Sequence, residues 1–244
     1  MKLSNLLLIA LCSLTLTSCV DFLEELFMNK DGTGTYRFTV DASALMELDM
    51  NQLQEMMGQG GGEETPELDL PENLDSTITF ASIAGDQLKN LERPEVFENA
   101  KMDIKMNKAN KELIFAINLD FEDIDDIAYF NENMGKIAGE GLEGMAGISS
   151  LAGGANVLFT KKGKTITRES PGETPDIPME GQEMEMLKMF LSSATYKSVY
   201  HFPKKVKKTT MQGAFIDGNK LTLERSFLDV LEGKGNLDGT IKYK

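Results

Sequence analysis

The chain has 244 residues and a formal net charge of −14, with 39 acidic side chains against 25 Lys and Arg. A surface this acidic repels phosphate backbones and so excludes nucleic acid as the expected partner. Trp is absent and aromatic residues make up 7% of the chain, which argues against a carbohydrate site built on stacking platforms.

The amino terminus has the features of a bacterial export signal. Lys2 supplies a positive charge, and Leu6 to Leu16 is an apolar stretch too short to cross a bilayer of roughly 30 Å. It ends in Leu16-Thr17-Ser18-Cys19, which resembles the lipobox of bacterial lipoproteins. The resemblance implies that residues 1–18 are a removed signal peptide and that Cys19 carries a diacylglycerol and often an amide-linked acyl chain. An ordinary signal peptide with an incidental cysteine is the alternative.

Residues 19–28 are expected to form a lipid anchor and tether. Asp21, Glu24 and Glu25 follow Cys19 closely, which resembles the surface-export signal of Bacteroidota lipoproteins. The other cysteine, Cys12, lies in the removed segment, so the mature protein has no thiol for a disulfide, a metal site or a nucleophile.

The next elements in chain order are a turn, a strand and a helix. Asn29 to Gly34 is turn-rich and looks like part of a calcium loop, but Val40 stands where the bidentate Glu belongs. Thr35 to Val40 alternates as a half-buried strand with Tyr36, Phe38 and Val40 on one face. A helix is predicted over Leu45 to Met57, and a mobile loop near 58–72.

The middle of the chain predicts a hairpin and a helix. Thr77 to Ile83 is ambiguous between strand and helix, whereas Ala100 to Asn107 and Glu112 to Leu119 alternate as an antiparallel hairpin. Asp120 to Ala138 is predicted as a helix. Its first turns hold five acids that complement the helix dipole, a metal site being the alternative: Asp120, Glu122, Asp123, Asp125 and Asp126.

Glycine-rich and strand-like segments complete the chain. Gly135 to Gly154 is either a flexible crossover or a flap over an apolar pocket, with mobile loops expected near 139–154 and 170–181. A helical face is predicted from Met184 to Ala194, and a short helix over Phe227 to Leu231. Strands are predicted over 157–161, 164–169, 196–202, 213–216, 220–224 and 237–243.

Catalytic constellations are not evident in the sequence. The single histidine, His201, ends a strand before Phe202-Pro203, where a structural or exposed role is expected. The one basic cluster is Lys204, Lys205, Lys207 and Lys208; it predicts either a patch for an anionic ligand, headgroup or acidic partner, or an edge strand kept unpaired by lysines. In a regular strand Lys204, Val206 and Lys208 would share one face.

Several short segments together resemble uncharacterised lipoproteins of Bacteroidota: the lipobox, Asp31 to Tyr36, Asp41-Ala42-Ser43, Tyr200 to Pro203 and Gly239 to Tyr243. The resemblance implies an envelope location and an α+β domain, and it brings no active site.

The sequence therefore predicts a single α+β domain over residues 29–244, with a mainly antiparallel sheet and about three helices packed on one face. The predicted function is a non-enzymatic lipoprotein of the outer membrane that binds a protein partner or an apolar ligand, without cofactor or metal. Which face of the membrane holds the domain is left open. The competing hypothesis is a hydrolase that acts through two carboxylates.

Overall fold

The computed structural model describes residues 20–47, 71–137, 157–170, 185, 188 and 191–244. Cys19 lies outside this part of the chain, as does most of the predicted helix over 45–57. Most of the predicted loops and the segment from 138 to 156 also lie outside it.

A large sheet forms the frame of the molecule. Its eight strands run in the order β10-β11-β8-β1-β2-β5-β4-β3. All its neighbouring strands are antiparallel except β1 and β8, which are parallel. The strands are β1 (Asp21–Met28), β2 (Gly34–Asp41), β3 (Asn73–Thr79), β4 (Ala100–Asn107), β5 (Glu112–Phe121), β8 (Thr195–His201), β10 (Phe215–Asp217) and β11 (Lys220–Ser226).

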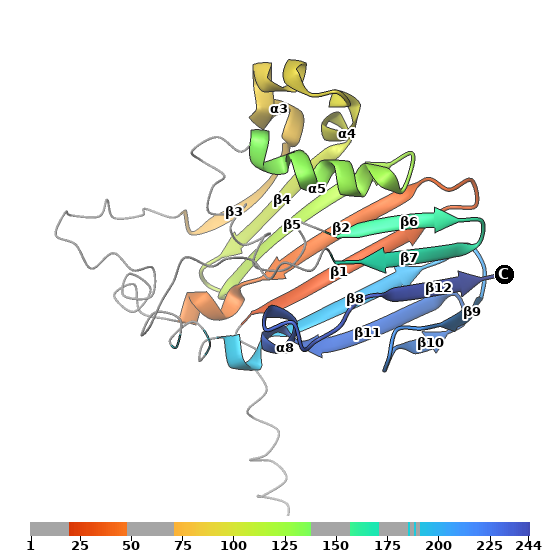
Figure 1. The fold of residues 1–244 in the computed structure, drawn as a ribbon. Coiled ribbons are helices and arrows are strands. Elements are labelled where there is room, and N and C mark those ends of the chain that lie inside the picture. Colours follow the sequence, from red (N-terminus) through yellow and green to blue (C-terminus); the bar gives the residue numbers. More distant parts are fainter. Residues whose placement is uncertain (1–19, 48–70, 138–156, 171–184, 186–187, 189–190) are drawn as a thin grey trace, which may run out of the picture.

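A second, smaller sheet covers part of one face of the first (Figure 1). It is antiparallel with the order β6-β7-β12-β9 and consists of β6 (Leu158–Lys162), β7 (Thr165–Glu169), β9 (Val206–Thr209) and β12 (Gly239–Tyr243). The helical elements are short apart from α5: η1 (Ser43–Glu47), α3 (Phe80–Ala84), η2 (Gly85–Asn90), α4 (Pro94–Glu98), α5 (Asp125–Ile137), η4 (Leu191–Ser193) and α8 (Phe227–Leu231).

The predicted fold class is confirmed, since the described chain is an α+β fold dominated by antiparallel sheet with few helices. The 100–107 and 112–119 hairpin and the helix over 227–231 are also confirmed. The helix predicted over Asp120 to Ala138 is present as α5 but begins at Asp125, because Asp120 and Phe121 are the last residues of β5. The ambiguous segment resolves into β3 followed by α3.

Two parts of the prediction need correction. The predicted tether over residues 19–28 does not extend through 21–28, because Asp21–Met28 forms β1 in the interior of the large sheet. Helices alone do not cover that sheet either: the small sheet shares its face with α5 (Figure 1). The reason is that the C-terminal strands each bury one side, exemplified by Ile166, Val206 and Ile241, and a strand with one apolar side must pack it against another layer.

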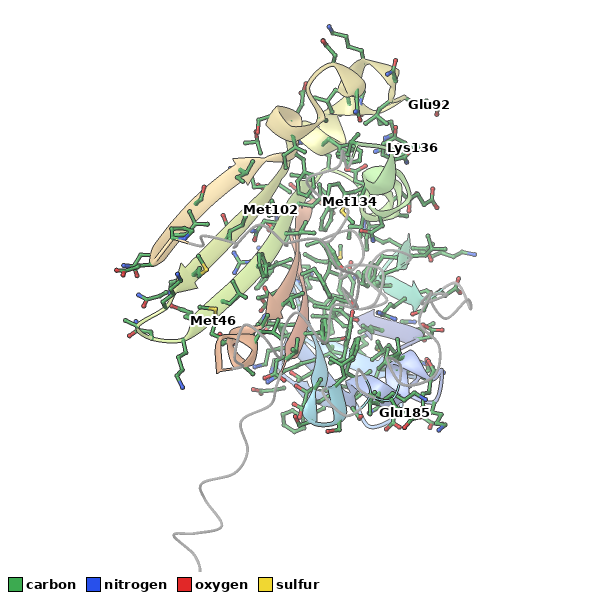
Figure 2. All side chains as sticks on the ribbon, turned by 90° about the vertical axis from the view of Figure 1, so that its left-hand side faces the viewer. Met46, Glu92, Met102, Met134, Lys136 and Glu185 are labelled. Atoms are coloured by element: carbon green, nitrogen blue, oxygen red, sulfur yellow. The ribbon has the colours of Figure 1, made fainter. Side chains whose placement is uncertain are left out.

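The core lies between the two sheets and beneath α5. Phe159 of β6 contacts Tyr36 of β2 and Tyr200 of β8 in edge-to-face geometry, with ring centroids 6.1 and 5.9 Å apart. Met102 of β4 and Met134 of α5 are 2% and 6% exposed and lie between the large sheet and the helix (Figure 2). Apolar contacts join the layers at these places, and one charged polar centre lies among them.

Candidate functional site

That polar centre is a group of charged and hydroxyl side chains enclosed between the sheets. Glu24 of β1 projects from the inner face of the large sheet, and Arg168 of β7 projects from the inner face of the small one. Their side chains are 0% and 1% exposed. Strand alternation explains their positions, since Glu24 lies two residues from buried Phe22 and Leu26, and Arg168 two residues from buried Ile166.

The Glu24 carboxylate is fully occupied by its neighbours. Arg168 donates from Nε to Oε1 at 3.2 Å and from Nη2 to Oε2 at 2.9 Å. Tyr200 donates to Oε1 at 2.6 Å and Tyr196 to Oε2 at 2.7 Å. This bidentate pairing plus two hydroxyl donors is the arrangement that a buried carboxylate requires to remain ionised.

The charges hold each other ionised. Burial by itself raises the pKa of Glu24, but the Arg168 charge and the hydrogen bonds from Arg168, Tyr200 and Tyr196 outweigh it and leave this pKa below its ordinary value. Burial alone lowers the pKa of Arg168, yet the Glu24 charge raises it well above the ordinary value. Burial and the Glu24 charge together raise the pKa of Tyr196 and Tyr200, so both phenols stay protonated.

Arg168 also connects this centre to the surface. Its Nη1 donates to Ser170 Oγ at 2.8 Å and to Asp238 Oδ1 at 3.3 Å, and Asp238 Oδ1 accepts from the Ser170 backbone N–H at 2.8 Å. The Asp238 side chain is 39% exposed. The guanidinium therefore spans from a sealed carboxylate to a solvent-facing one.

A shallow polar pocket of about 740 Å³ lies at this outer end of the network. Its lining comes from the small sheet and the segment before β12: Leu158, Thr167, Arg168, Glu169, Ser170, Thr210, Asn236, Asp238, Gly239 and Thr240. Many of its polar groups already bond to each other; Asn236 Oδ1 accepts from the Asp238 N–H at 2.6 Å, and Thr210 Oγ1 accepts from the Thr240 N–H at 2.8 Å.

The two carboxylates that converge on Arg168 do not form a hydrolytic pair. A two-carboxylate hydrolase needs one acid to protonate a leaving group and another to activate water or attack. Glu24 is sealed from solvent, ionised, and has all its acceptor positions filled. The centre is therefore suited to joining the two sheets and not to proton transfer with a substrate.

The structure disperses the other residues that the sequence singled out. His201 stacks on Phe27 with ring centroids 4.5 Å apart, and its pKa is lowered by burial and by Lys220, against a raising effect of Glu25. No group of three or more His, Cys, Asp or Glu that could hold a metal occurs among the described residues.

The acids near the start of α5 have structural partners. The Asp126 carboxylate pairs with Arg93 and accepts from the backbone N–H groups of Glu122 and Asp123 at 2.9 and 3.0 Å. Asp120 accepts from Thr35 Oγ1 at 2.8 Å. The Asp126 contacts support the prediction that acids serve the start of the helix. Asp120 instead belongs to β5 and accepts its hydrogen bond from β2.

The turn between β1 and β2 occupies the position of the partial calcium loop. Asp31 Oδ1 accepts from the Thr33 backbone N–H at 3.1 Å and from Thr33 Oγ1 at 2.9 Å. Gly32 has φ of 106°, a backbone conformation that glycine adopts readily, in keeping with the turn-rich sequence. The carboxylate therefore closes the turn.

The lysine cluster is divided by a β-bulge. Val206 lies opposite buried Tyr243 and Lys208 opposite exposed Lys242, with a register shift between Lys242 and Tyr243. The prediction that Val206 and Lys208 share a face is therefore wrong, because the bulge adds a residue and reverses the alternation.

Sequence reasoning missed Glu24 and Arg168 as partners. The position of Glu24 after Cys19 assigns it to the acidic export signal, although Phe22, Leu26 and Met28 flank it at even spacing and mark the inner face of a strand. A charged residue within an apolar alternation signals a buried pair, but its partner lies 144 positions away and the pattern does not name it.

Comparisons with known proteins give no family. No protein-family model matches the sequence, and no curated protein matches it. The NMR structure of the folded domain of the Mycobacterium tuberculosis LppM protein is similar to this chain, with a TM-score of 0.41 and 8% identity over 93% of this chain and 90% of that one. The resemblance to Bacteroidota lipoproteins stays a prediction.

Within the described part of the chain, no helix has both the length and the apolar character needed to cross a bilayer.

Proposed function

We propose that the chain is a lipoprotein of the bacterial cell envelope, anchored in the outer membrane through a lipid on Cys19, and that its domain binds a partner without catalysing a reaction. The observation that carries the proposal is that the described fold begins directly after Cys19 in the sequence. β1 begins at Asp21, and Val20 between them is only 6% exposed. A lipid on Cys19 would therefore hold one end of the large sheet directly at the bilayer.

Growth with labelled palmitate tests the anchor. The full chain should incorporate the label and sediment with membranes. Cys19→Ala should lose both properties. Cys12→Ala should retain them, because Cys12 lies in the signal peptide that is cleaved from the mature protein under this proposal. A Cys19→Ala protein that stays labelled contradicts the proposal.

Binding of a protein partner is supported by an aromatic patch, which we define as Phe27, His201 and Phe215, on the outer face of the large sheet. Phe27 is 37% exposed and Phe215 is 68% exposed. Phe215 lies opposite Thr222, and Thr222 lies opposite Val199, so Phe215 shares this face with Val199, which precedes His201 by two residues on β8. Exposed aromatic side chains are enriched at protein interfaces.

A photo-crosslinking residue at position 215 tests this contact in intact cells. We expect a discrete crosslinked species from position 215 and none from position 101, since Lys101 is also exposed but lies on β4, toward the other edge of the sheet. Equal crosslinking from both positions would argue against a partner at the patch.

The sequence also predicts two other functions, carriage of an apolar ligand and hydrolysis through two carboxylates. Carriage of an apolar ligand beneath Gly135 to Gly154 falls mostly on residues outside the described part, so it remains a prediction, which lipid extraction and mass spectrometry of the purified chain would test. The carboxylate hydrolase gains no support from Glu24 and Asp238, which are committed to Arg168.

A further inference from the structure

The outer face of the small sheet is strongly basic in an otherwise acidic protein. Residues 158–169, 203–209 and 239–244 hold ten Lys and Arg against one acid, Glu169. Apart from buried Arg168 these basic side chains are all exposed. We call eight of them the lysine face: Lys162, Lys164, Lys204, Lys205, Lys207, Lys208, Lys242 and Lys244.

Strand register aligns three of these lysines in a row across the sheet. Lys162 lies opposite Thr165, Thr165 opposite Lys242, and Lys242 opposite Lys208. Adjacent strands are about 4.8 Å apart, so Lys242 and Lys208 are directly opposed, while Thr165 separates Lys242 from Lys162. Among the described residues, no acid forms an ion pair with any member of the lysine face.

Protection of sheet edges explains only part of this arrangement. Lysines on the edge strands β6 and β9 discourage pairing with another chain. Lys242 lies on β12, which is paired on both sides, so it has no edge to protect. Like charges directly opposite each other destabilise a sheet, which means that the row opposes folding stability unless a negative partner covers it.

A row of hydroxyls adjoins the row of lysines. Thr160 lies opposite Thr167, Thr167 opposite Thr240, and Thr210 Oγ1 lies 3.3 Å from Thr240 Oγ1. Three of these threonines line the polar pocket. Apart from Leu158 and Glu169 at one end, the outward positions of the small sheet thus present ammonium and hydroxyl groups. Both exposed large hydrophobic residues of the described chain, Phe27 and Phe215, belong to the large sheet.

The charged end of this face points away from the proposed anchor. β8 runs parallel to β1 and leads at its far end into Lys204 and Lys205. The C-terminus and the turn between β6 and β7 lie at that same end (Figure 1). Strand β1 of eight residues separates the two ends by about 25 Å. Screening lengths in physiological salt are about 8 Å, so headgroups of the anchoring membrane would exert little attraction there.

We propose that the lysine face binds an anionic polysaccharide whose chain carries carboxylate or phosphate groups. Lysine is depleted and aromatic residues are enriched at the centre of protein interfaces, which disfavours an acidic protein on a face of Lys and Thr. Lysine ammonium groups can pair with the anionic groups of a hydrated glycan, and threonine hydroxyls can hydrogen-bond to its hydroxyls. Such binding does not need the aromatic stacking platforms that this chain lacks. The orientation away from the membrane rests on the proposed anchor, but the binding itself does not.

Binding of polygalacturonate to the full chain, purified in non-ionic detergent, tests the proposal. We expect saturable binding that weakens steeply as salt is raised, and none to uncharged dextran. A Lys162→Gln/Lys208→Gln/Lys242→Gln variant should bind roughly tenfold more weakly, since each exposed ion pair contributes a small share. A Lys101→Gln/Lys108→Gln/Lys197→Gln variant, which removes the same charge from exposed positions of the large sheet and the β4–β5 turn, should bind as the parent does.

Competition experiments separate the other polyanions. Tighter binding to duplex DNA, to an acidic protein or to vesicles containing phosphatidylglycerol than to the glycan would overturn the proposal. Equal loss of binding in the two triple variants would also overturn it, because net charge alone would then explain the interaction. Loss of palmitate labelling at Cys19 would leave these measurements unchanged, so the two proposals can fail separately.

Discussion

The two faces of the small sheet treat positive charge in opposite ways. On the inner face one cation, Arg168, is 1% exposed and meets Glu24, Ser170 and Asp238. On the outer face eight lysines are exposed without an acid to pair with in the described chain. A buried charge must be matched within the fold because desolvation is costly, whereas exposed charges are solvated and remain available to a partner. The comparison separates charges that serve stability from charges that can serve binding.

The largest effect should come from breaking the buried pair. Glu24→Met or Arg168→Met alone leaves an uncompensated buried charge and should lower the free energy of unfolding by about 3–5 kcal/mol. The double variant removes both charges. Its loss of unfolding free energy should therefore be distinctly smaller than the sum of the losses in the two single variants. Urea unfolding of all four proteins measures this coupling. Simple additivity would mean that the two side chains do not interact as described.

The hydrogen bonds from Tyr196 and Tyr200 to Glu24 should also contribute to stability. Tyr196→Phe or Tyr200→Phe removes a hydrogen bond to a charged acceptor and should cost about 1.5–3 kcal/mol. Tyr36→Phe is the matched control, since Tyr36 Oη is buried without a hydrogen-bond partner among the described residues and its loss should cost little. A Tyr36→Phe effect as large as the others would reveal an interaction that the structure does not contain.

Acid should weaken the inner network. The folded pKa of Glu24 lies below the ordinary 4.5, so its ionisation contributes stability that is fully present above pH 4.5 and is lost as the pH falls through the folded pKa. Each pKa unit of lowering corresponds to about 1.4 kcal/mol. The free energy of unfolding should be measured between pH 7 and pH 3. In Glu24→Gln it should fall less steeply with acid than in the parent protein, because the Glu24 contribution is absent. An unchanged acid slope in that variant would show that other carboxylates govern acid unfolding.

The smallest effect belongs to the outer face and has the opposite sign. Lys242→Thr removes one member of a directly opposed Lys pair, so it should raise the free energy of unfolding by about 0.2–1 kcal/mol. The stabilisation should shrink in high salt, which screens the repulsion. Thermal melts at low and high ionic strength measure both effects. A destabilised Lys242→Thr protein would place Lys242 among the groups that hold the sheet together.

Local patterns in the sequence determined much of the fold. Alternation over 100–107 and 112–119 identified the β4–β5 hairpin, and the acids from Glu122 to Asp126 marked the beginning of α5. These features depend on neighbours within a few residues, which a sequence displays directly. The lipobox at Cys19 is equally local, and the sequence alone carries that prediction, because the described structure begins at Val20.

Only the tertiary structure decided which distant residues meet. It placed β1 beside β8 and across from β7, which joined Glu24 to Arg168 and turned a supposed tether into a central strand. It also aligned Lys162 and Lys242 with Lys208 in one row. The sequence shows only that Lys208 belongs to a cluster of lysines adjacent in the chain. Strand order, the division into two sheets and a one-residue bulge set these contacts. These three features depend on how separate segments pack. The sequence does not specify them, because the alternation within a strand is the same whichever strand pairs with it.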